Sequence, residues 1–247
     1  VFRFVHWVRP DSIPAMRAMF LLFDLTALTF IILTLNAMGK NRNLCLVYFW
    51  SPLLIKETFN STHLDVIGVS LLCVSLYFYV RARFSAALVF LALSVLGKLY
   101  PIILLPLYLK RMMALSGNIK TLALNLALFA AIIGVLYLPF LNIGAKAFAG
   151  LGAYAAQWEN NDSLFALLLY LFNSVPGLKA IPYLSGNLAT FLCKATIAMI
   201  LLAALFYLLN NREREKSALN GVNRIFIMLG LVFILSPVQN PWYLGWL

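Results

Sequence analysis

Long apolar segments recur along the whole chain without alternating polar and apolar residues. Three of them, residues 15–38, 121–141 and 188–209, are each about as long as a membrane span. A helix needs about 20 apolar residues to cross the hydrocarbon core, where every backbone hydrogen bond must be made internally. Because period-two alternation is missing, helices are favoured over a barrel. The sequence therefore predicts an all-α, polytopic transmembrane helix bundle.

The composition supports this class and excludes another. Hydrophobic residues make up 63% of the 247 residues and charged residues 11%, whereas soluble domains are about half apolar and a quarter charged. The net charge of +11 does not indicate a nucleic-acid partner, because the charges lie in short loops where membrane topology explains them. The predicted partners therefore include membrane lipids and no nucleic acid.

We expect a single transmembrane domain over residues 1–247, and we interpret it as a fragment that lacks an N-terminal span and C-terminal spans. The chain begins at Val1 in VFRFVHWVRP and stops at Leu247 in WYLGWL, and neither end resembles a natural terminus. Residues 1–14 mix aromatic residues with arginine and are predicted to lie at the membrane interface. The predicted membrane segments are residues 15–38, 44–55, 64–80, 85–109, 121–141, 163–173, 188–209 and 223–235.

The loop charges orient these segments. One set of loops holds 11 of the 19 basic residues, and the other holds 5 of the 8 acidic residues together with the longest loop, residues 142–162, which could extend to residue 187. The positive-inside rule places the basic set in the cytoplasm. The basic set is Lys40, Arg42, Arg81, Arg83, Lys110, Arg111, Lys120, Arg212, Arg214, Lys216 and Arg224; the acidic set is Asp11, Glu57, Asp65, Glu159 and Asp162.

The same rule predicts a hairpin in residues 85–109. Arg81 and Arg83 precede this segment and Lys110 follows it, so both of its ends should lie on one side. Two short helices that meet near Lys98 satisfy this, and each would be about 16–20 Å long at 1.5 Å per residue. We therefore expect short re-entrant or broken helices on the non-cytoplasmic side, lining a cavity.

The first candidate site lies between two apolar segments, in WSPLLIKETFNSTHLD. Its polar side chains can supply a general base, bind sugar hydroxyls or hold a divalent ion. An ordinary loop, with His63 and Asp65 capping the next helix, is the alternative. The candidate residues are Lys56, Glu57, Asn60, His63 and Asp65.

The second candidate is Lys98, in LSVLGKLYPIILLP. A lysine inside an apolar segment is costly unless it is paired, hydrated or bound to an anion. We interpret Lys98 as an anion site, with phosphate as the anion. The alternative is that its side chain extends to the membrane interface.

Two further segments carry polar and aromatic residues on the predicted outer side. YAAQWENNDSLF contains Trp158 and Asn161, and SPVQNPWYLGWL contains Gln239, Trp242 and Tyr243. Trp158 can stack on a sugar, while the neighbouring amides and acids can bind its hydroxyls. The interfacial aromatic belt and helix capping by Asp162 are the alternatives.

Two ionisable residues lie within predicted spans. Asp24 and Lys194 are functional candidates on that ground. Hydration of Asp24, or extension of Lys194 to the interface, is the alternative. No phosphate-binding P-loop, nucleophile elbow or zinc-protease motif occurs in the chain.

Four motifs occur in an order that resembles the GT-C superfamily of bacterial membrane glycosyltransferases. YFWSPLLIKETFNSTHLD resembles the W-x-P-L-x-I-x-E and H-x-D segment, LGKLYPIILLPLYL the K-x-x-P segment, WENNDSLF the W-x-x-N-D-S-L-F loop, and SPVQNPWYLGW the S-P-x-x-x-P-W-Y-L-x-W segment. Within it, the chain is similar to glycosyltransferase family 87, the polyprenol-phosphate-mannose-dependent mannosyltransferases, over residues 15–247.

The resemblance implies a hexosyltransferase that moves mannose from a polyprenyl-phosphate-sugar donor to a lipid or glycan acceptor outside the cytoplasm. It implies a multi-pass protein of the bacterial inner (plasma) membrane, part of the cell-envelope machinery. It also implies a catalytic acid in an outer loop that would precede Val1, which leaves Glu57 and Asp65 as candidates within the chain. No cofactor or metal site is predicted, although a divalent cation stays open.

Two other classes of function remain open. A transporter or lipid flippase also uses broken helices and intramembrane lysines, but no repeated half is visible in the sequence. A non-catalytic assembly subunit is the other. The expected site residues all fall on the outer side, which favours an outward-facing active site.

Overall fold

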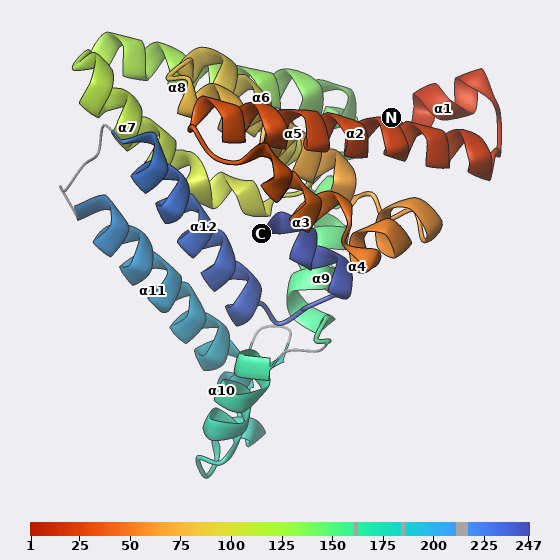
Figure 1. Ribbon diagram of the computed structural model, residues 1–247. Coiled ribbons are helices and arrows are strands. Elements are labelled where there is room, and N and C mark those ends of the chain that lie inside the picture. Colours follow the sequence, from red (N-terminus) through yellow and green to blue (C-terminus); the bar gives the residue numbers. More distant parts are fainter. Residues whose placement is uncertain (161–162, 184–185, 211–216) are drawn as a thin grey trace. The chain divides into compact units, whose positions relative to one another are not determined.

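The computed structural model describes residues 1–160, 163–183, 186–210 and 217–247. These residues are helical almost throughout, apart from a hairpin of two short strands, β1 (Pro182–Tyr183) and β2 (Gly186–Asn187) (Figure 1). The predicted all-α class is therefore confirmed. The chain divides into two compact units: the first is Val1–Val135, Glu213–Ile225 and Pro241–Leu247, and the second is Leu136–Arg212 and Phe226–Asn240.

Four helices of the described residues are long and apolar enough to cross a membrane. Of the most apolar 18 residues in α2 (Ile13–Ala37), only 11% are buried within the protein. For the helical segment Ile119–Gly144, the share is 6%. Apolar surface of this extent is stable in lipid and not in water, so the prediction of a helical membrane protein is confirmed to this extent. The other two are α11 (Leu188–Asn210) and α12 (Ala218–Leu235).

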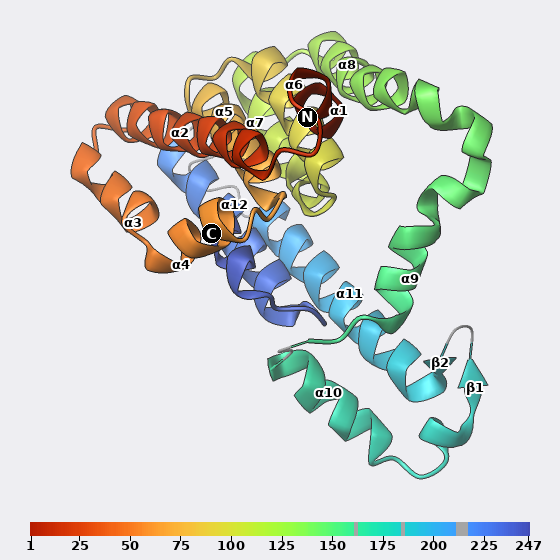
Figure 2. The ribbon, with the colours of Figure 1, turned by 90° about the vertical axis from the view of Figure 1, so that its right-hand side faces the viewer.

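The core of the first unit is a layer of three helices. α5 (Asp65–Val80) packs against both α2 and α6 (Phe84–Gly97), as Figures 1 and 2 show. Hydroxyl groups join these helices: Ser75 donates to the carbonyl of Ala87 at 2.7 Å, and Ser94 donates to the carbonyl of Gly68 at 2.8 Å. Small residues and interhelical hydrogen bonds of this kind are typical of helix packing in membranes.

The segment 85–109 is broken at Lys98, as predicted. After α6 the chain passes through the 3₁₀ turn η3 (Tyr100–Leu104) into α7 (Leu105–Ser116). The guanidinium of Arg111 on α7 donates to the carbonyl of Tyr79 at the end of α5. The basic residues at both ends of this segment are therefore close together, and Lys98 lies at the opposite end of α6.

The remaining elements of the first unit are short, apart from α8. The predicted segment 44–55 consists of η1 (Arg42–Cys45), α3 (Leu46–Phe49) and α4 (Pro52–Leu54), followed by the π-helical turn η2 (Ile55–Asn60). α1 (Phe2–Val8) precedes α2, α8 (Ile119–Tyr137) follows α7, and η6 (Pro241–Trp246) ends the chain.

The second unit has a small core of its own. Phe165 of α10 (Ser163–Asn173), Cys193 and Ile197 of α11, and Leu235 pack together. The predicted loop 142–162 contains helix over most of its length, in η4 (Leu138–Phe148), which is kinked at Gly144, and in α9 (Ala149–Gln157). Alanine makes up four of the nine residues of α9 and favours the helix there. The turn η5 (Leu178–Ala180) leads into the hairpin.

Candidate functional site

An ion pair joins the ends of two neighbouring helices in the first unit. Asp65 is the first residue of α5, Lys98 directly follows α6, and the Lys98 ammonium donates to the Asp65 carboxylate. The side chains are only 10% and 23% exposed. Burial at this level makes each charge depend on the other, so the pair fixes both helix ends.

Two glycines allow the backbones of α5 and α6 to come close together beside this ion pair. A Cβ atom on Gly97 would lie 3.2 Å from the Cα and N of Gly68, and one on Gly68 would lie 3.5 Å from the Cβ of Lys98. The backbones of α5 and α6 therefore come close together next to the ion pair. Such contact between helices requires residues without large side chains.

Aromatic side chains from the end of the chain surround Lys98. Its Nζ lies 3.8 Å from the ring centroid of Tyr243 and 4.6 Å from that of Trp246. Trp246 also donates from Nε1 to the Asp65 carboxylate at 3.1 Å, and its ring stacks on Tyr100 at 4.1 Å. The ammonium thus has a carboxylate and two π faces as partners, all of which stabilise a cation.

A second acidic centre forms around Glu57 in η2. Its carboxylate is buried, 2.9 Å from Lys56 Nζ and 3.2 Å from His63 Nε2. The hydrogen bond from Lys56 lowers the pKa of Glu57 below its ordinary value, although burial acts in the opposite direction. Glu57 is therefore ionised at neutral pH and orients the imidazole of His63.

The two centres adjoin through Trp242. The ring of His63 stacks on Trp242 with centroids 3.6 Å apart, and Trp242 packs edge-on against Tyr243 at 5.9 Å. His63, Asp65 and Trp242 line one small cavity of about 10 Å³. That volume holds about one water molecule, so a sugar would require Trp242 or its neighbours to move. The other lining residues are Tyr48, Leu54, Thr58, Val66, Val69 and Gly245.

The structure thus brings seven predicted residues together: Lys56, Glu57, His63, Asp65, Lys98, Trp242 and Tyr243. Asn60 instead contacts Arg17, whose Nη2 donates to its backbone carbonyl at 3.1 Å and to its Oδ1 at 3.5 Å. Sequence reasoning missed Tyr100 and Trp246. The W-x-x-x-W spacing of the last segment was the available signal for Trp246, because it places a second tryptophan one helical turn after Trp242.

In the second unit, Asn160 links the predicted segment 154–165 to residues 237–240. Asn160 donates from its amide nitrogen to the carbonyl of Pro237 at 3.0 Å and accepts from the amide nitrogen of Gln239 at 2.8 Å. Its side chain donates to Asn240 at 3.0 Å. The Gln239 side chain bonds back to Ile234, and Trp158 is 55% exposed. The predicted residues Asn161 and Asp162 lie outside the described residues.

The two intramembrane candidates have different surroundings. Asp24 accepts a hydrogen bond of 2.7 Å from the hydroxyl of Tyr48, so its carboxyl has a partner inside the protein. Lys194 is half-buried on α11. Tyr48 also lines the small cavity beside His63, Asp65 and Trp242, so Asp24 adjoins that cavity through its partner.

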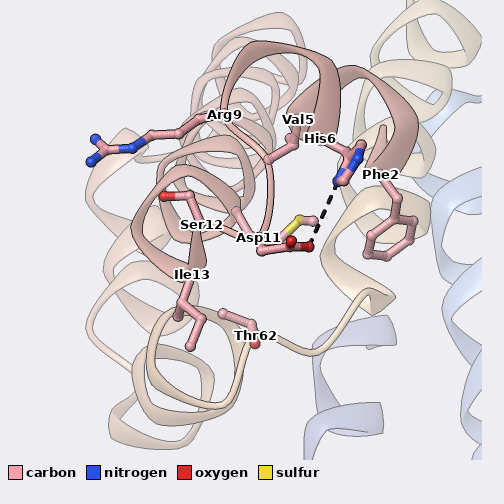
Figure 3. Close-up of a pocket in the computed structure, with 9 residues that line it drawn as sticks. Phe2, Val5, His6, Arg9, Asp11, Ser12, Ile13 and Thr62 are labelled. Carbon is pink, nitrogen blue, oxygen red and sulfur yellow. Dashed lines mark ion pairs between the residues drawn. The ribbon is translucent and has the colours of Figure 1, made fainter.

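A larger pocket, of about 510 Å³, lies at the start of the chain (Figure 3). His6 and Asp11 point toward one another there, with Nδ1 3.7 Å from Oδ1, while Arg9 points away. Both partners are exposed, so their attraction is strongly screened. The pocket therefore belongs to the interfacial segment predicted for residues 1–14 and contributes no buried charge to the site.

No protein-family model, curated protein or solved structure matches the chain. Within the described residues, no group of three or more histidine, cysteine, aspartate or glutamate side chains is placed to hold a metal ion.

Proposed function

We propose that the chain is the membrane domain of a glycosyltransferase. This enzyme would transfer the hexose mannose from a polyprenyl-phosphate donor to a lipid or glycan acceptor. One observation carries the proposal. Three segments that resemble GT-C motifs, around residues 57–65, 98–101 and 242–246, converge on one group of side chains in the first unit. A set of independent loops would have no reason to converge in this way.

Lys98 fits the role of the donor-phosphate ligand. In inverting transfer, the acceptor oxygen bonds to C1 of the sugar, the bond from C1 to the phosphate oxygen breaks, and the acceptor proton passes to a base. The leaving polyprenyl phosphate gains negative charge, which an ammonium stabilises. The phosphate would compete with Asp65 for Lys98, so donor binding would release the Asp65 carboxylate from its ion pair.

The base would come from the acids near the cavity. A base must lie within hydrogen-bond reach of the hydroxyl that it deprotonates. Asp65 lines the cavity beside His63 and Trp242, whereas Glu57 is not among the residues that line it. Asp65 is therefore the stronger candidate within the chain, and His63 and Trp242 are the candidates for holding the acceptor or the sugar.

We also propose how this site is placed in the membrane. The broken segment around Lys98 would be a re-entrant hairpin that opens on the non-cytoplasmic side, in a multi-pass protein of the bacterial inner membrane. Supporting this, Arg111 returns to the end of α5, next to Arg81 and Arg83. The positive-inside rule places this basic end in the cytoplasm and Lys98 near the opposite face.

The decisive experiment measures transfer of labelled mannose from polyprenyl-phosphate-mannose by membranes that contain the full-length protein. Lys98→Met should reduce transfer at limiting donor at least tenfold, and Lys98→Arg should retain part of it. Lys146→Met, which removes an exposed lysine of the second unit, is the matched control. Flipping or uptake of a substrate, without transfer from any lipid-linked donor, would instead establish a transporter.

A further inference from the structure

A second pocket lies at the basic end of the first unit, at the other end of α6 from Lys98. Its volume is about 630 Å³, and it is lined by residues from the turn before α6, from α7 and from the start of α8. α6 has 14 residues, so the pocket and Lys98 are separated by about 20 Å along the helix. Nothing in the proposed transfer reaction uses this pocket.

The start of α6 forms one wall and is not capped by a side chain. Arg83 precedes the helix and makes no side-chain hydrogen bond to it, and the helix begins with Phe84 and Ser85. The first amide groups of a helix have no acceptor within the helix and carry partial positive charge. Phe84, Ser85 and Ala86 all line the pocket, which therefore presents amide donors suited to an anion.

Arg83 adds a full positive charge that has no acid nearby in the sequence. It lines the pocket and is exposed. Residues 66–158 contain seven lysines and arginines and neither aspartate nor glutamate. A guanidinium is well suited to bind a phosphate through two parallel hydrogen bonds.

Asn125 provides an independent indication of a ligand. This residue lines the pocket and is only 5% exposed. Its Nδ2 donates to the carbonyl of Thr121 at 2.8 Å, but its buried Oδ1 has no hydrogen-bond partner. An unpaired buried acceptor costs free energy, and a hydroxyl donor on a ligand would remove that cost.

The remaining wall is apolar. Phe84, Met112 and Leu115 line the pocket, and they offer a surface that a free phosphate ion would not use. A phospholipid, in contrast, places acyl chains directly beside its phosphate. Its headgroup would meet Arg83 and the start of α6 while the chains contact the apolar residues.

We propose that this pocket binds an anionic phospholipid whose headgroup carries a hydroxyl group. The phosphodiester binds to Arg83 and to the first amides of α6, and the headgroup hydroxyl donates to Asn125 Oδ1. The chemistry corresponds to a glycerol headgroup on a phosphodiester.

The first test measures lipid retention by native mass spectrometry of the full-length protein in detergent, with phosphatidylglycerol and phosphatidylcholine as probes. Wild type should retain phosphatidylglycerol at least tenfold more strongly. Arg83→Gln should remove most of this preference, whereas Arg81→Gln should change it less than twofold, because Arg81 does not line the pocket. Equal effects of the two substitutions would mean attraction to the basic surface only and would overturn the proposal.

The second test addresses the hydroxyl group. Phosphatidylmethanol has the same charge as phosphatidylglycerol but carries no headgroup hydroxyl. Wild type should prefer phosphatidylglycerol several-fold, and Asn125→Leu should bind both lipids equally while it still excludes phosphatidylcholine. Equal binding of both lipids by wild type would contradict the role of Asn125.

A competition experiment distinguishes a lipid ligand from a free anion. Inorganic phosphate at millimolar concentration should not displace phosphatidylglycerol, because it cannot contact Phe84, Met112 and Leu115 as acyl chains do. Displacement would identify a site for free phosphate and overturn the lipid assignment. All arms can be read without any transferase assay, so their outcome is independent of the proposed function.

Discussion

The ammonium of Lys98 and the carboxylate of Asp65 form an ion pair between residues that are 33 positions apart, at the adjoining ends of α6 and α5. Trp246 also donates a hydrogen bond to the Asp65 carboxylate. A lysine within an apolar segment is tolerated when its charge is compensated, and this pair supplies the compensation. An external phosphate would therefore have to replace a partner that Lys98 already has.

The pair should be energetically coupled. Lys98→Met and Asp65→Asn should each lower the free energy of unfolding by about 1–3 kcal/mol, since each leaves a poorly exposed charge or polar group without its partner. The double variant should lose less than the sum of the two. Urea unfolding in detergent micelles measures the cycle, with Lys146→Met as the control, and strict additivity would show that the pair contributes nothing.

The glycine at the end of α6 should be intolerant of a side chain. Gly97→Ala places a Cβ atom 3.2 Å from backbone atoms of Gly68, and these cannot move as a flexible side chain can. We expect a loss of about 1–3 kcal/mol, as for other overpacked contacts.

Gly134→Ala on α8 is the matched control for Gly97→Ala. A Cβ atom there meets nothing within 4 Å, so the variant should be neutral or stabilised by up to about 1 kcal/mol through its higher helix propensity. The melting temperatures of the two variants in one detergent test this. Equal melting temperatures would refute the packing argument.

The break of the helix at Lys98 could be predicted because the loop charges and the local residues both indicate a helix end there. Arg81 and Lys110 required both ends of the segment on one side, and Gly97 and Pro101 marked where a helix would stop. The contact between Gly68 and Gly97 could not be predicted. It depends on which helices pack together, and an apolar helix in lipid carries little periodicity to indicate its packing face.

Trp246 and Tyr100 were missed for a related physical reason. Aromatic residues near the ends of spans commonly form the interfacial belt, so an aromatic residue that contacts a buried ion pair looks the same in sequence as one that faces headgroups. The polar residues were easier to identify, since Glu57, His63 and Lys98 are costly in apolar surroundings and must have partners.

Acid should reveal the contribution of Glu57. Because Lys56 lowers its pKa below the ordinary value of 4.5, the ionised carboxylate stabilises the fold above pH 4.5. That stabilisation is lost as the pH falls through the lowered pKa. Lys56→Met should therefore be less stable than wild type at pH 6–7, and the difference should begin to shrink as the pH falls below 4.5.

The melting temperature between pH 3 and pH 7 measures this convergence. The effect should be modest, since the Lys56 side chain is 67% exposed and its charge is screened. Glu57→Gln supplies the control, because in that background Lys56→Met should show no pH-dependent difference. A difference that persists unchanged to pH 3 would mean that Lys56 acts by packing.

The turn between α5 and α6 should be improved by a glycine. Ala82 has a φ of 55°, and the amides of Ala82 and Arg83 bond to the carbonyls of Tyr79 and Phe78 at 3.1 and 2.9 Å. This pattern is a Schellman motif, in which the left-handed position favours glycine. A Cβ atom in that conformation costs about 1 kcal/mol. Ala82→Gly should therefore raise the free energy of unfolding by about 0.5–1 kcal/mol, after the added flexibility of the unfolded chain is subtracted.

Ala127→Gly, in the middle of α8, is the control for Ala82→Gly. It should lower the free energy of unfolding by up to about 1 kcal/mol. Destabilisation by both substitutions, measured by urea unfolding in one detergent, would show that the left-handed conformation at Ala82 carries no strain.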